Sequence, residues 1–515
     1  MLTAVLAGLA LVPFAPALDR LTGRAAGWVC AAVPAGLFVY FVSLAPAVIR
    51  GQGVVSVTPW VPSLGLVLSF HLDGLSLLFA LLITGIGTFI FLYAGAYLTG
   101  DPRRGRLFAF LAFFMSAMLG TVLADNVLAL FVFWELTSIS SYLLIGFDHE
   151  RAAARAAALQ ALLVTGLGGL AMLAGVLLLA RAGGTYELSE LVGRSGAIVI
   201  DPRYEICLGL ILLGAFTKSA QWPFSFWLPG AMEAPSPVSA YLHSSTMVKA
   251  GVYLVARMTP ILGGTAIWTG VVSTVGLLTM IVGAVLAARQ TDLKRILAYS
   301  TVSALGTMMW LLGTGTVLSA TAAMSFLLGH AFYKAALFLA AGTVAHETGE
   351  REFGRLGGLR SLMPMTATAA MLAALSMAGF PPMLGFIGKE LVFDAALHAP
   401  AFMPVVAIVA LVTMTLFVAL GLLVGFSPFW GTRPETLRRA REGPPELWLG
   451  ALLLSACGLL AGLVPAAAGW ILQPAIAAVT GTTVQFAPGL WHGFTPTLLF
   501  SALALMGGTW LYRRC

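Results

Sequence analysis

The residues best placed to carry out chemistry are lysines at positions where burying a charged side chain costs free energy. The sequence has five lysines, and four of them, Lys218, Lys249, Lys334 and Lys389, fall inside long apolar segments. Lys218 and Lys249 lie about twelve residues and Lys334 about sixteen residues into their segments, which at ~1.5 Å of rise per residue is near the middle of a bilayer. A charge at that depth costs at least ~2.5–3.5 kcal/mol and usually marks an ion or proton path.

Lysine suits proton transfer in a way that arginine does not. A desolvated ammonium is driven toward its neutral form, and a nearby carboxylate or water restores the charge. A lysine that is both desolvated and close to a carboxylate or water can therefore release or accept a proton when its partner moves. Arginine, in contrast, stays protonated. The choice of lysine at all the deeply buried basic positions predicts proton traffic.

Three further titratable residues lie within apolar segments. Glu135 is eight residues into its segment, and His330 stands four residues before Lys334, so that the two share a helix face. His243 has two readings of equal weight, a helix-packing histidine and a member of the path. Lys389 lies near a segment end, where a snorkelling lysine is the competing interpretation.

Three other charged residues are predicted to be structural or remain open. Asp73 and Asp125 stand near helix starts, where they are expected to act as caps or as partners of the helix dipole. Lys294 is the one lysine near a loop.

Composition sets the class of protein. Of 515 residues, 59% are hydrophobic and only 10% are charged, whereas a soluble chain carries roughly 25% charged residues. A water-soluble enzyme is thus excluded. The net charge of +7 does not indicate nucleic-acid binding, because the basic residues are dispersed in short loops. No metal, cofactor or disulfide set is predicted from the four scattered cysteines, Cys30, Cys207, Cys457 and Cys515.

The fold class is an all-α polytopic membrane protein with about 14–15 transmembrane helices. The N-terminal segment lacks a small-residue cleavage site and is expected to be a retained first helix. The predicted spans are 2–18, 25–49, 72–99, 107–124, 127–147, 155–180, 206–228, 237–258, 260–287, 293–314, 318–345, 363–393, 401–426, 447–471 and 495–512.

The distribution of arginine predicts the orientation. Loops after odd-numbered spans hold nineteen basic residues and loops after even-numbered spans hold five. By the positive-inside rule the N-terminus is then outside and the C-terminus cytoplasmic, with the chain in the cell inner (plasma) membrane. The first set is Arg20, Arg24, Arg103, Arg104, Arg106, Arg151, Arg155, Arg289, Lys294, Arg295, Arg351, Arg355, Arg360, Arg433, Arg438, Arg439, Arg441, Arg513 and Arg514; the second is Arg50, Arg181, Arg194, Arg203 and Arg257.

Two spans are predicted to be broken helices. Proline and glycine interrupt the seventh span after Lys218, at 221–237, and the twelfth before Lys389, at 379–385. A break beside a charge in each half is typical of inverted-repeat transporters, although two unrelated kinks are the alternative. The predicted divisions are 1–106 (helices 1–3), 107–258 and 259–426 (two inverted five-helix repeats) and 427–515 (C-terminal helices).

Five stretches carry a resemblance to a known family. They read FWELTSISSYLLIGF at 133–147, TKSAQWPFSFWLPGAMEAPSPVSAYLHSSTMVKAGVYL at 217–254, DLKRILAYSTVSALG at 292–306, GHAFYKAALFLAAG at 329–342 and GFPPMLGFIGKE at 379–390. In this order they resemble the antiporter-like subunits of respiratory complex I and of Mrp-type sodium/proton antiporters. The stretches around Glu135 and His243 are most similar to the Mrp A subunits. The likeness covers about 70–430 well and the ends weakly.

The resemblance implies roles for the buried charges. Glu135 and Lys218 would form an ion pair between the fifth and seventh helices. His243 and Lys249 on the eighth, His330 and Lys334 on the eleventh and Lys389 on the broken twelfth would continue a hydrated lateral axis. Lys294, in the stretch at 292–306, would belong to an inner entry, with a simple loop position as the equal alternative. The Mrp A subunits usually continue into a long C-terminal membrane region beyond the point that matches residue 515, and whether a partner supplies it is left open.

The function expected from this resemblance is cation/proton antiport. The chain would be a secondary transporter subunit, not an enzyme, exchanging H⁺ for Na⁺ or another monovalent cation together with other membrane subunits of a hetero-oligomeric complex. Breaking the Glu135–Lys218 pair would start proton transfer toward Lys249, Lys334 and Lys389. The alternatives are a proton-pumping subunit of complex I or a membrane-bound hydrogenase, and a scaffold or passive channel without transport.

Overall fold

The structure is a computed structural model of the 515-residue chain. It describes residues 1–61, 63, 66–400, 402–437, 440–486, 488–490 and 493–514, so Arg438, Arg439 and Cys515 lie outside the described residues. The longer helices are α1 (Leu2–Thr22), α2 (Ala26–Ile49), α3 (Gly74–Tyr97), α4 (Arg104–Leu123), α5 (Val127–Ile145), α6 (Ala152–Gly183), α9 (Tyr204–Lys218), α13 (Ala266–Ala288), α14 (Leu293–Thr314), α15 (Val317–Thr348), α18 (Met403–Phe426), α19 (Pro445–Leu463), α20 (Ala466–Thr480) and α21 (Pro496–Tyr512).

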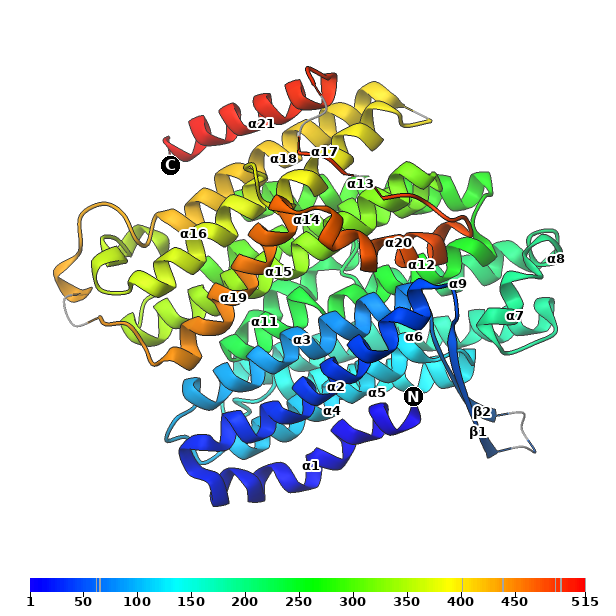
Figure 1. The fold of residues 1–515 in the computed structure, drawn as a ribbon, viewed down its shortest axis with the longest axis horizontal. Helices are drawn as coiled ribbons and strands as arrows, with labels where there is room; N and C mark the ends of the chain where they lie inside the picture. Colours follow the sequence, from blue (N-terminus) through cyan, green and yellow to red (C-terminus); the bar gives the residue numbers. More distant parts are fainter. Residues whose placement is uncertain are drawn as a thin grey trace.

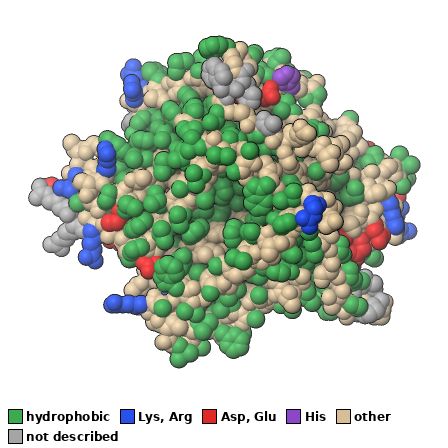
Figure 2. Space-filling view, viewed as in Figure 1, with side chains coloured by type: hydrophobic (Ala, Val, Ile, Leu, Met, Phe, Trp, Pro, Cys, Tyr) green, Lys and Arg blue, Asp and Glu red, His purple; other side chains and the backbone are tan. Residues whose placement is uncertain are grey.

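The helices lie side by side along one direction, as expected of membrane spans (Figure 1). Within the described residues, ten helical stretches are long and apolar enough to cross a membrane, the first of which joins α1 and α2. Each of the fifteen predicted segments contains at least one helix. The polytopic helical membrane fold predicted from the sequence is thus confirmed, apart from one β-hairpin described below. Figure 2 shows hydrophobic side chains over the middle of one face and most of its basic side chains toward the ends.

Three spans are interrupted, including the two that the sequence predicts. The seventh ends as α9 at Lys218 and is followed by short turns, among them α10 (Trp227–Gly230) and the 3₁₀ turn η4 (Ala231–Glu233). The twelfth divides into α16 (Pro364–Ala378) and α17 (Leu384–Leu397). The eighth span, predicted to be continuous, is also broken. It consists of α11 (Ser236–Ser244), the 3₁₀ turn η5 (Met247–Lys249) and α12 (Ala250–Leu262).

One end of the bundle, the hairpin end, carries a β-hairpin that the sequence analysis described only as a polar connection. Strands β1 (Val54–Val61) and β2 (Leu66–Leu72) pair antiparallel and project from the helices (Figure 1). Two short helices, α7 (Leu188–Val192) and α8 (Ser195–Val199), lie in the connection between α6 and α9. The predicted fourteenth span ends early, at Leu463, and its last part begins the separate helix α20.

The two aspartates near helix starts are structural, as predicted. The Asp73 side chain caps α3 by accepting a hydrogen bond from the Ser76 backbone N–H. It also pairs with Arg257 of α12, at 2.5 Å. Asp125 caps no helix of its own, since Asn126 caps α5, but it accepts two hydrogen bonds from Ser189 and ties the start of α5 to α7.

The opposite end, the basic end, is held together by ion pairs between connections. Arg104 pairs with Asp19 at 2.6 Å and Arg351 pairs with Asp292 at 3.5 Å. Arg151 pairs with Glu233, which lies in the broken part of the seventh span. Loops that follow odd-numbered spans therefore meet at this end, as the arginine distribution predicts.

Close backbone contact fixes α13 against α14. A Cβ added at Gly306 would lie 2.4 Å from the Met280 backbone nitrogen, and one at Gly276 would lie 2.3 Å from that of Trp310. Small residues allow such approaches between membrane helices. The contact positions α14, which supplies acceptors to a buried lysine described below.

We expect Gly306→Ala to destabilise the protein by about 1–3 kcal/mol, because the added methyl overpacks the α13–α14 contact. Thermal unfolding of the purified assembly in detergent measures the change. Gly270→Ala on α13 is the matched control, since a Cβ there meets nothing within 4 Å. Equal melting temperatures for the two variants would show that the close approach is not required.

Candidate functional site

Lys218 ends α9 and turns its side chain toward α5. Its ammonium is fully buried and donates hydrogen bonds to the Trp134 carbonyl oxygen at 3.2 Å and to the Ser138 hydroxyl at 2.7 Å. The ammonium also lies 5.1 Å from the centre of the Trp134 ring, within the range of a cation–π contact. Lys218 is thus held by neutral groups of α5.

The direct Glu135–Lys218 ion pair expected from the family resemblance is absent from this structure. The two residues belong to the described part of the chain, yet no carboxylate oxygen of Glu135 lies within 4 Å of the lysine amine. The Glu135 carboxylate turns instead toward α6, and its buried Oε1 atom has no hydrogen-bond partner. The Lys218 amine instead donates its hydrogen bonds to the Trp134 carbonyl and the Ser138 hydroxyl, which lie on either side of Glu135 along α5.

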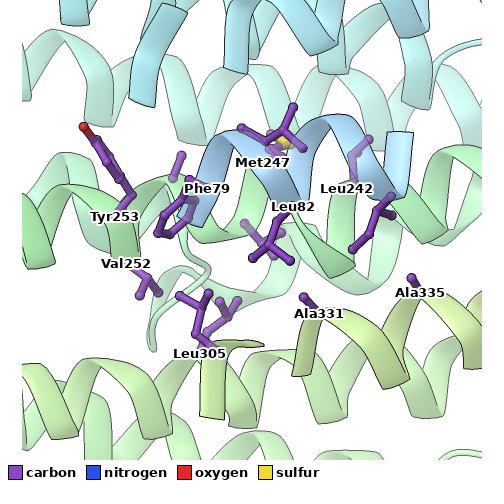
Figure 3. Close-up of a cluster of buried hydrophobic side chains, with 14 of the residues drawn as sticks. Phe79, Leu82, Leu242, Met247, Val252, Tyr253, Leu305, Ala331 and Ala335 are labelled. Carbon is purple, nitrogen blue, oxygen red and sulfur yellow. The ribbon is translucent and has the colours of Figure 1, made fainter. Parts of the chain in front are cut away.

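Lys249 lies where the eighth span is broken. It is the last residue of η5, is fully buried, and donates to the Leu327 carbonyl oxygen of α15 at 3.1 Å. Apolar side chains surround this break (Figure 3). They come from α3, α11, η5, α12, α14 and α15 and include Phe79, Leu82, Leu242, Met247, Val252, Tyr253, Leu305, Ala331 and Ala335.

Lys334 of α15 repeats the arrangement seen at Lys218. Its ammonium is fully buried and donates to the Leu297 carbonyl oxygen at 3.0 Å and to the Ser300 hydroxyl at 2.5 Å, both on α14. In both cases one neighbouring helix offers a backbone carbonyl and a serine hydroxyl one turn farther along. At both lysines, a serine hydroxyl and a nearby backbone carbonyl oxygen of the same helix accept hydrogen bonds from the amine.

Lys389 does not snorkel, because only 2% of its surface is exposed. Its amine donates to the carbonyl oxygen of Ala378, the last residue of α16, and at 3.4 Å to that of Met414 on α18. The carbonyl of a helix end has no partner within its own helix. The break between α16 and α17 thus creates an acceptor for the amine.

His243 and His330 are both fully buried, and neither imidazole has a hydrogen-bond partner on either ring nitrogen. The ring of His243 lies 5.0 Å from that of Phe338, and the ring of His330 lies 5.4 Å from that of Tyr333. Both contacts involve α15, the helix that carries Lys334. The packing and the proton-path readings of His243 both fit this position.

Other buried polar atoms of the described residues also lack a hydrogen-bond partner. Buried polar groups in native proteins are almost always hydrogen-bonded to protein or to ordered water. Each of these atoms is therefore a candidate position for a water molecule. They include Ser325 Oγ and Tyr333 Oη on α15, Ser376 Oγ on α16, Thr413 Oγ1 on α18, and Gln221 Oε1 and Ser245 Oγ in the turns after α9 and α11, but also Ser116 Oγ on α4 and Ser273 Oγ on α13, which carry no lysine.

Sequence reasoning missed Lys294 as a buried group. It lies in the first turn of α14 with only 3% of its surface exposed, and donates to the carbonyl oxygens of Met232 at 3.1 Å and Ala234 at 2.7 Å. A cavity of about 180 Å³ at the basic end borders it, together with Arg151 and Glu233. The scarcity of lysine in this sequence was the signal that could have identified it.

Comparison with known proteins defines the family. Residues 124–417 match the sequence profile of the family described as NADH:quinone oxidoreductase/Mrp antiporter, transmembrane region. The chain belongs to this family. Residues 60–108 also match the N-terminal region of NADH-ubiquinone oxidoreductase (complex I) chain 5. This family member is a multi-pass membrane protein, as the helices indicate.

Individual relatives are similar over almost the whole chain. The A/B subunit of a probable K⁺/H⁺ antiporter of Rhizobium meliloti is 43% identical over 98% of the chain. The A subunit of an Na⁺/H⁺ antiporter of Alkalihalophilus pseudofirmus is 40% identical over 94%. The structure of an Mrp complex from Dietzia sp. matches 99% of the chain with a TM-score of 0.89 and 36% identity.

The chain spans only part of these relatives. It covers 51% of the Rhizobium meliloti protein, 64% of the Alkalihalophilus pseudofirmus protein and 55% of the Dietzia chain. An archaeal membrane-bound sulfane sulfur reductase complex is also similar in fold, with a TM-score of 0.79 and 24% identity over 88% of this chain and 76% of its own.

We expect Ser138→Ala to destabilise the protein by about 1.5–3 kcal/mol, because the buried Lys218 ammonium loses a hydrogen bond. Thermal unfolding measures the loss. In a Lys218→Met background the same substitution should cost almost nothing. Ser140→Ala is the matched control, since the Ser140 hydroxyl donates only within its own helix. Equal losses in both backgrounds would contradict the contact.

Proposed function

We propose that this chain is a membrane subunit of a multisubunit antiporter that exchanges H⁺ for Na⁺ or another monovalent cation. The observation that carries the proposal is the row of amines buried inside a protein that spans the membrane. Lys218, Lys249, Lys334 and Lys389 are at most 2% exposed. Groups with such a placement are expensive and serve ion or proton paths. The names of the relatives in Rhizobium and Alkalihalophilus support the same activity.

The path follows α15. Lys218 lies at one end of the path, where its amine is hydrogen-bonded to α5. Lys249 bonds to the α15 backbone, and His330 and Lys334 are α15 side chains. Lys389 follows on α17, which packs beside α15, since a Cβ at Gly388 would lie 3.3 Å from the Phe326 Cα. Water bound to the unpartnered polar atoms joins these groups, and His243 contributes from α11.

The transfer of a proton along this row depends on Glu135. When the carboxylate approaches Lys218, it stabilises the ammonium. When it withdraws toward α6, the ammonium has only neutral acceptors, and its proton passes to the next group. A buried charge that loses its partner is destabilised by ~3–5 kcal/mol, which is enough to drive such a step. The carboxylate position therefore acts as the switch.

The same proposal extends to organisation and placement. The divisions are 1–106, the two inverted repeats 107–258 and 259–426, and 427–515. The ion pairs that collect arginine at the basic end support a cytoplasmic position for that end, in the cell inner (plasma) membrane with the N-terminus outside. The partners are other membrane subunits, the lipid bilayer, H⁺ and Na⁺. The chain works as a transporter, not as an enzyme, and needs neither a cofactor nor a nucleic acid.

The redox-driven alternative, a proton-pumping subunit of complex I or a hydrogenase, has weaker support. The likeness to the sulfane sulfur reductase complex, at 24% identity, concerns the fold alone. The relatives named as antiporter subunits are 40% identical or more. Co-purification with membrane subunits alone supports antiport, whereas co-purification with soluble redox subunits supports the alternative.

We expect Lys218→Ala, Lys334→Ala and Glu135→Ala each to reduce cation-driven proton flux by about tenfold or more, which corresponds to ~1.4 kcal/mol on the barrier. The intact complex is reconstituted into vesicles, and flux is followed with a pH-sensitive dye after addition of Na⁺ or K⁺. Arg181→Ala, at an exposed position near the hairpin end, is the control and should keep full flux. Normal assembly with full flux in the lysine variants would remove the mechanism.

A further inference from the structure

The Glu135 carboxylate lies against a part of α6 where glycines leave no side chains. A Cβ added at Gly169 would lie only 1.8 Å from Glu135 Oε1 and 3.3 Å from Trp134 Cδ1. One added at Gly166, a turn earlier, would lie 4.0 Å from Oε2, which is ordinary contact. Real Cβ atoms do not approach oxygen to 1.8 Å. The carboxylate thus occupies the space that a side chain at 169 would need.

The carboxylate gains no hydrogen bond in this position. Its Oε1 atom is buried, and it has no hydrogen-bond partner in the structure. A buried oxygen without a partner is costly. Lys218 offers the nearest compensating charge and bonds to the residue before Glu135 and to the residue three positions after it. The stable alternative for the carboxylate therefore lies toward α9, and the position on α6 is open only because residue 169 has no side chain.

We propose that Gly169 is a positioning residue that gives Glu135 a withdrawn position, separated from Lys218. This inference rests on the proposed function and adds a residue of α6 to it. The space above Gly169 permits the carboxylate to leave the lysine, and the lack of a partner there returns it. A side chain at 169 removes the withdrawn position and keeps the carboxylate against Lys218.

The first test uses stability, which does not depend on transport. In the assembled complex, Gly169→Ala should keep or raise the melting temperature, because the methyl group displaces the flexible end of Glu135 from an unpartnered position to the ion pair with Lys218. In a Glu135→Ala background the same substitution should lose this gain, since no carboxylate is left to move. Gly166→Ala, on the same helix, should have little effect in either background. A loss of stability in the wild-type background, or an equal change from Gly169→Ala in both backgrounds, would overturn this account of the contact.

The second test uses flux and its pH profile. Gly169→Ala should reduce cation-driven proton flux about fivefold or more. This factor is at the lower end of the effects that one coupled site usually has on another. It should also move the optimum to higher pH by about one unit, because a carboxylate kept beside Lys218 holds the proton on the amine. Gly166→Ala should keep the wild-type profile.

The outcomes separate the two proposals. Reduced flux with an unchanged pH profile would show a merely structural role and overturn the positioning role of Gly169. Wild-type flux and profile in Gly169→Ala would overturn it as well. If the wild-type complex shows no cation-driven flux at all, the proposed function fails, whereas the melting-temperature cycle still decides whether Gly169 makes room for Glu135.

Discussion

The constraint that governs this structure is the need of a desolvated ammonium for oxygen acceptors. Each of the five lysine amines is buried and donates a hydrogen bond to at least one backbone carbonyl oxygen. Among the described residues no carboxylate pairs with any of them. Neutral acceptors hold an ammonium less strongly than a carboxylate does. The proposed proton transfer depends on this difference, because an ion pair at each lysine would stabilise the bound proton.

Interrupted helices meet this constraint at Lys389 and Lys294, whereas the other three amines bond to carbonyls within α5, α14 and α15. A continuous helix uses its carbonyls internally, whereas a helix end leaves several without partners. The end of α16 supplies the Ala378 carbonyl to Lys389, and the turns after α9 supply those of Met232 and Ala234 to Lys294. Around the break in the eighth span, apolar side chains close the space between helices, as Figure 3 shows. Helix ends and turns thus supply carbonyl acceptors to Lys389 and Lys294, and apolar side chains pack around the break near Lys249.

The sequence was sufficient to predict the helical membrane class and to place six of the seven site residues within apolar segments. For Lys389, where snorkelling was the alternative, the structure shows burial. It could not predict the acceptors. Ser138 and Ser140 stand in one motif and look alike, but only the position of α9 makes Ser138 the partner of Lys218. The break at 245–249 contains no proline or glycine and gave no signal. The withdrawn carboxylate of Glu135 depends on the tertiary fit of α5 against α6.

The central claim is that water joins the buried amines into one path. The most direct measurement is a structure of the intact complex in lipid at a resolution that shows ordered water. The account predicts water at the unpartnered atoms of His330, Tyr333 and Ser325, continuing from Lys249 past Lys334 toward Lys389. Apolar contact between these groups, with no water density near the imidazoles or the amines, would contradict it.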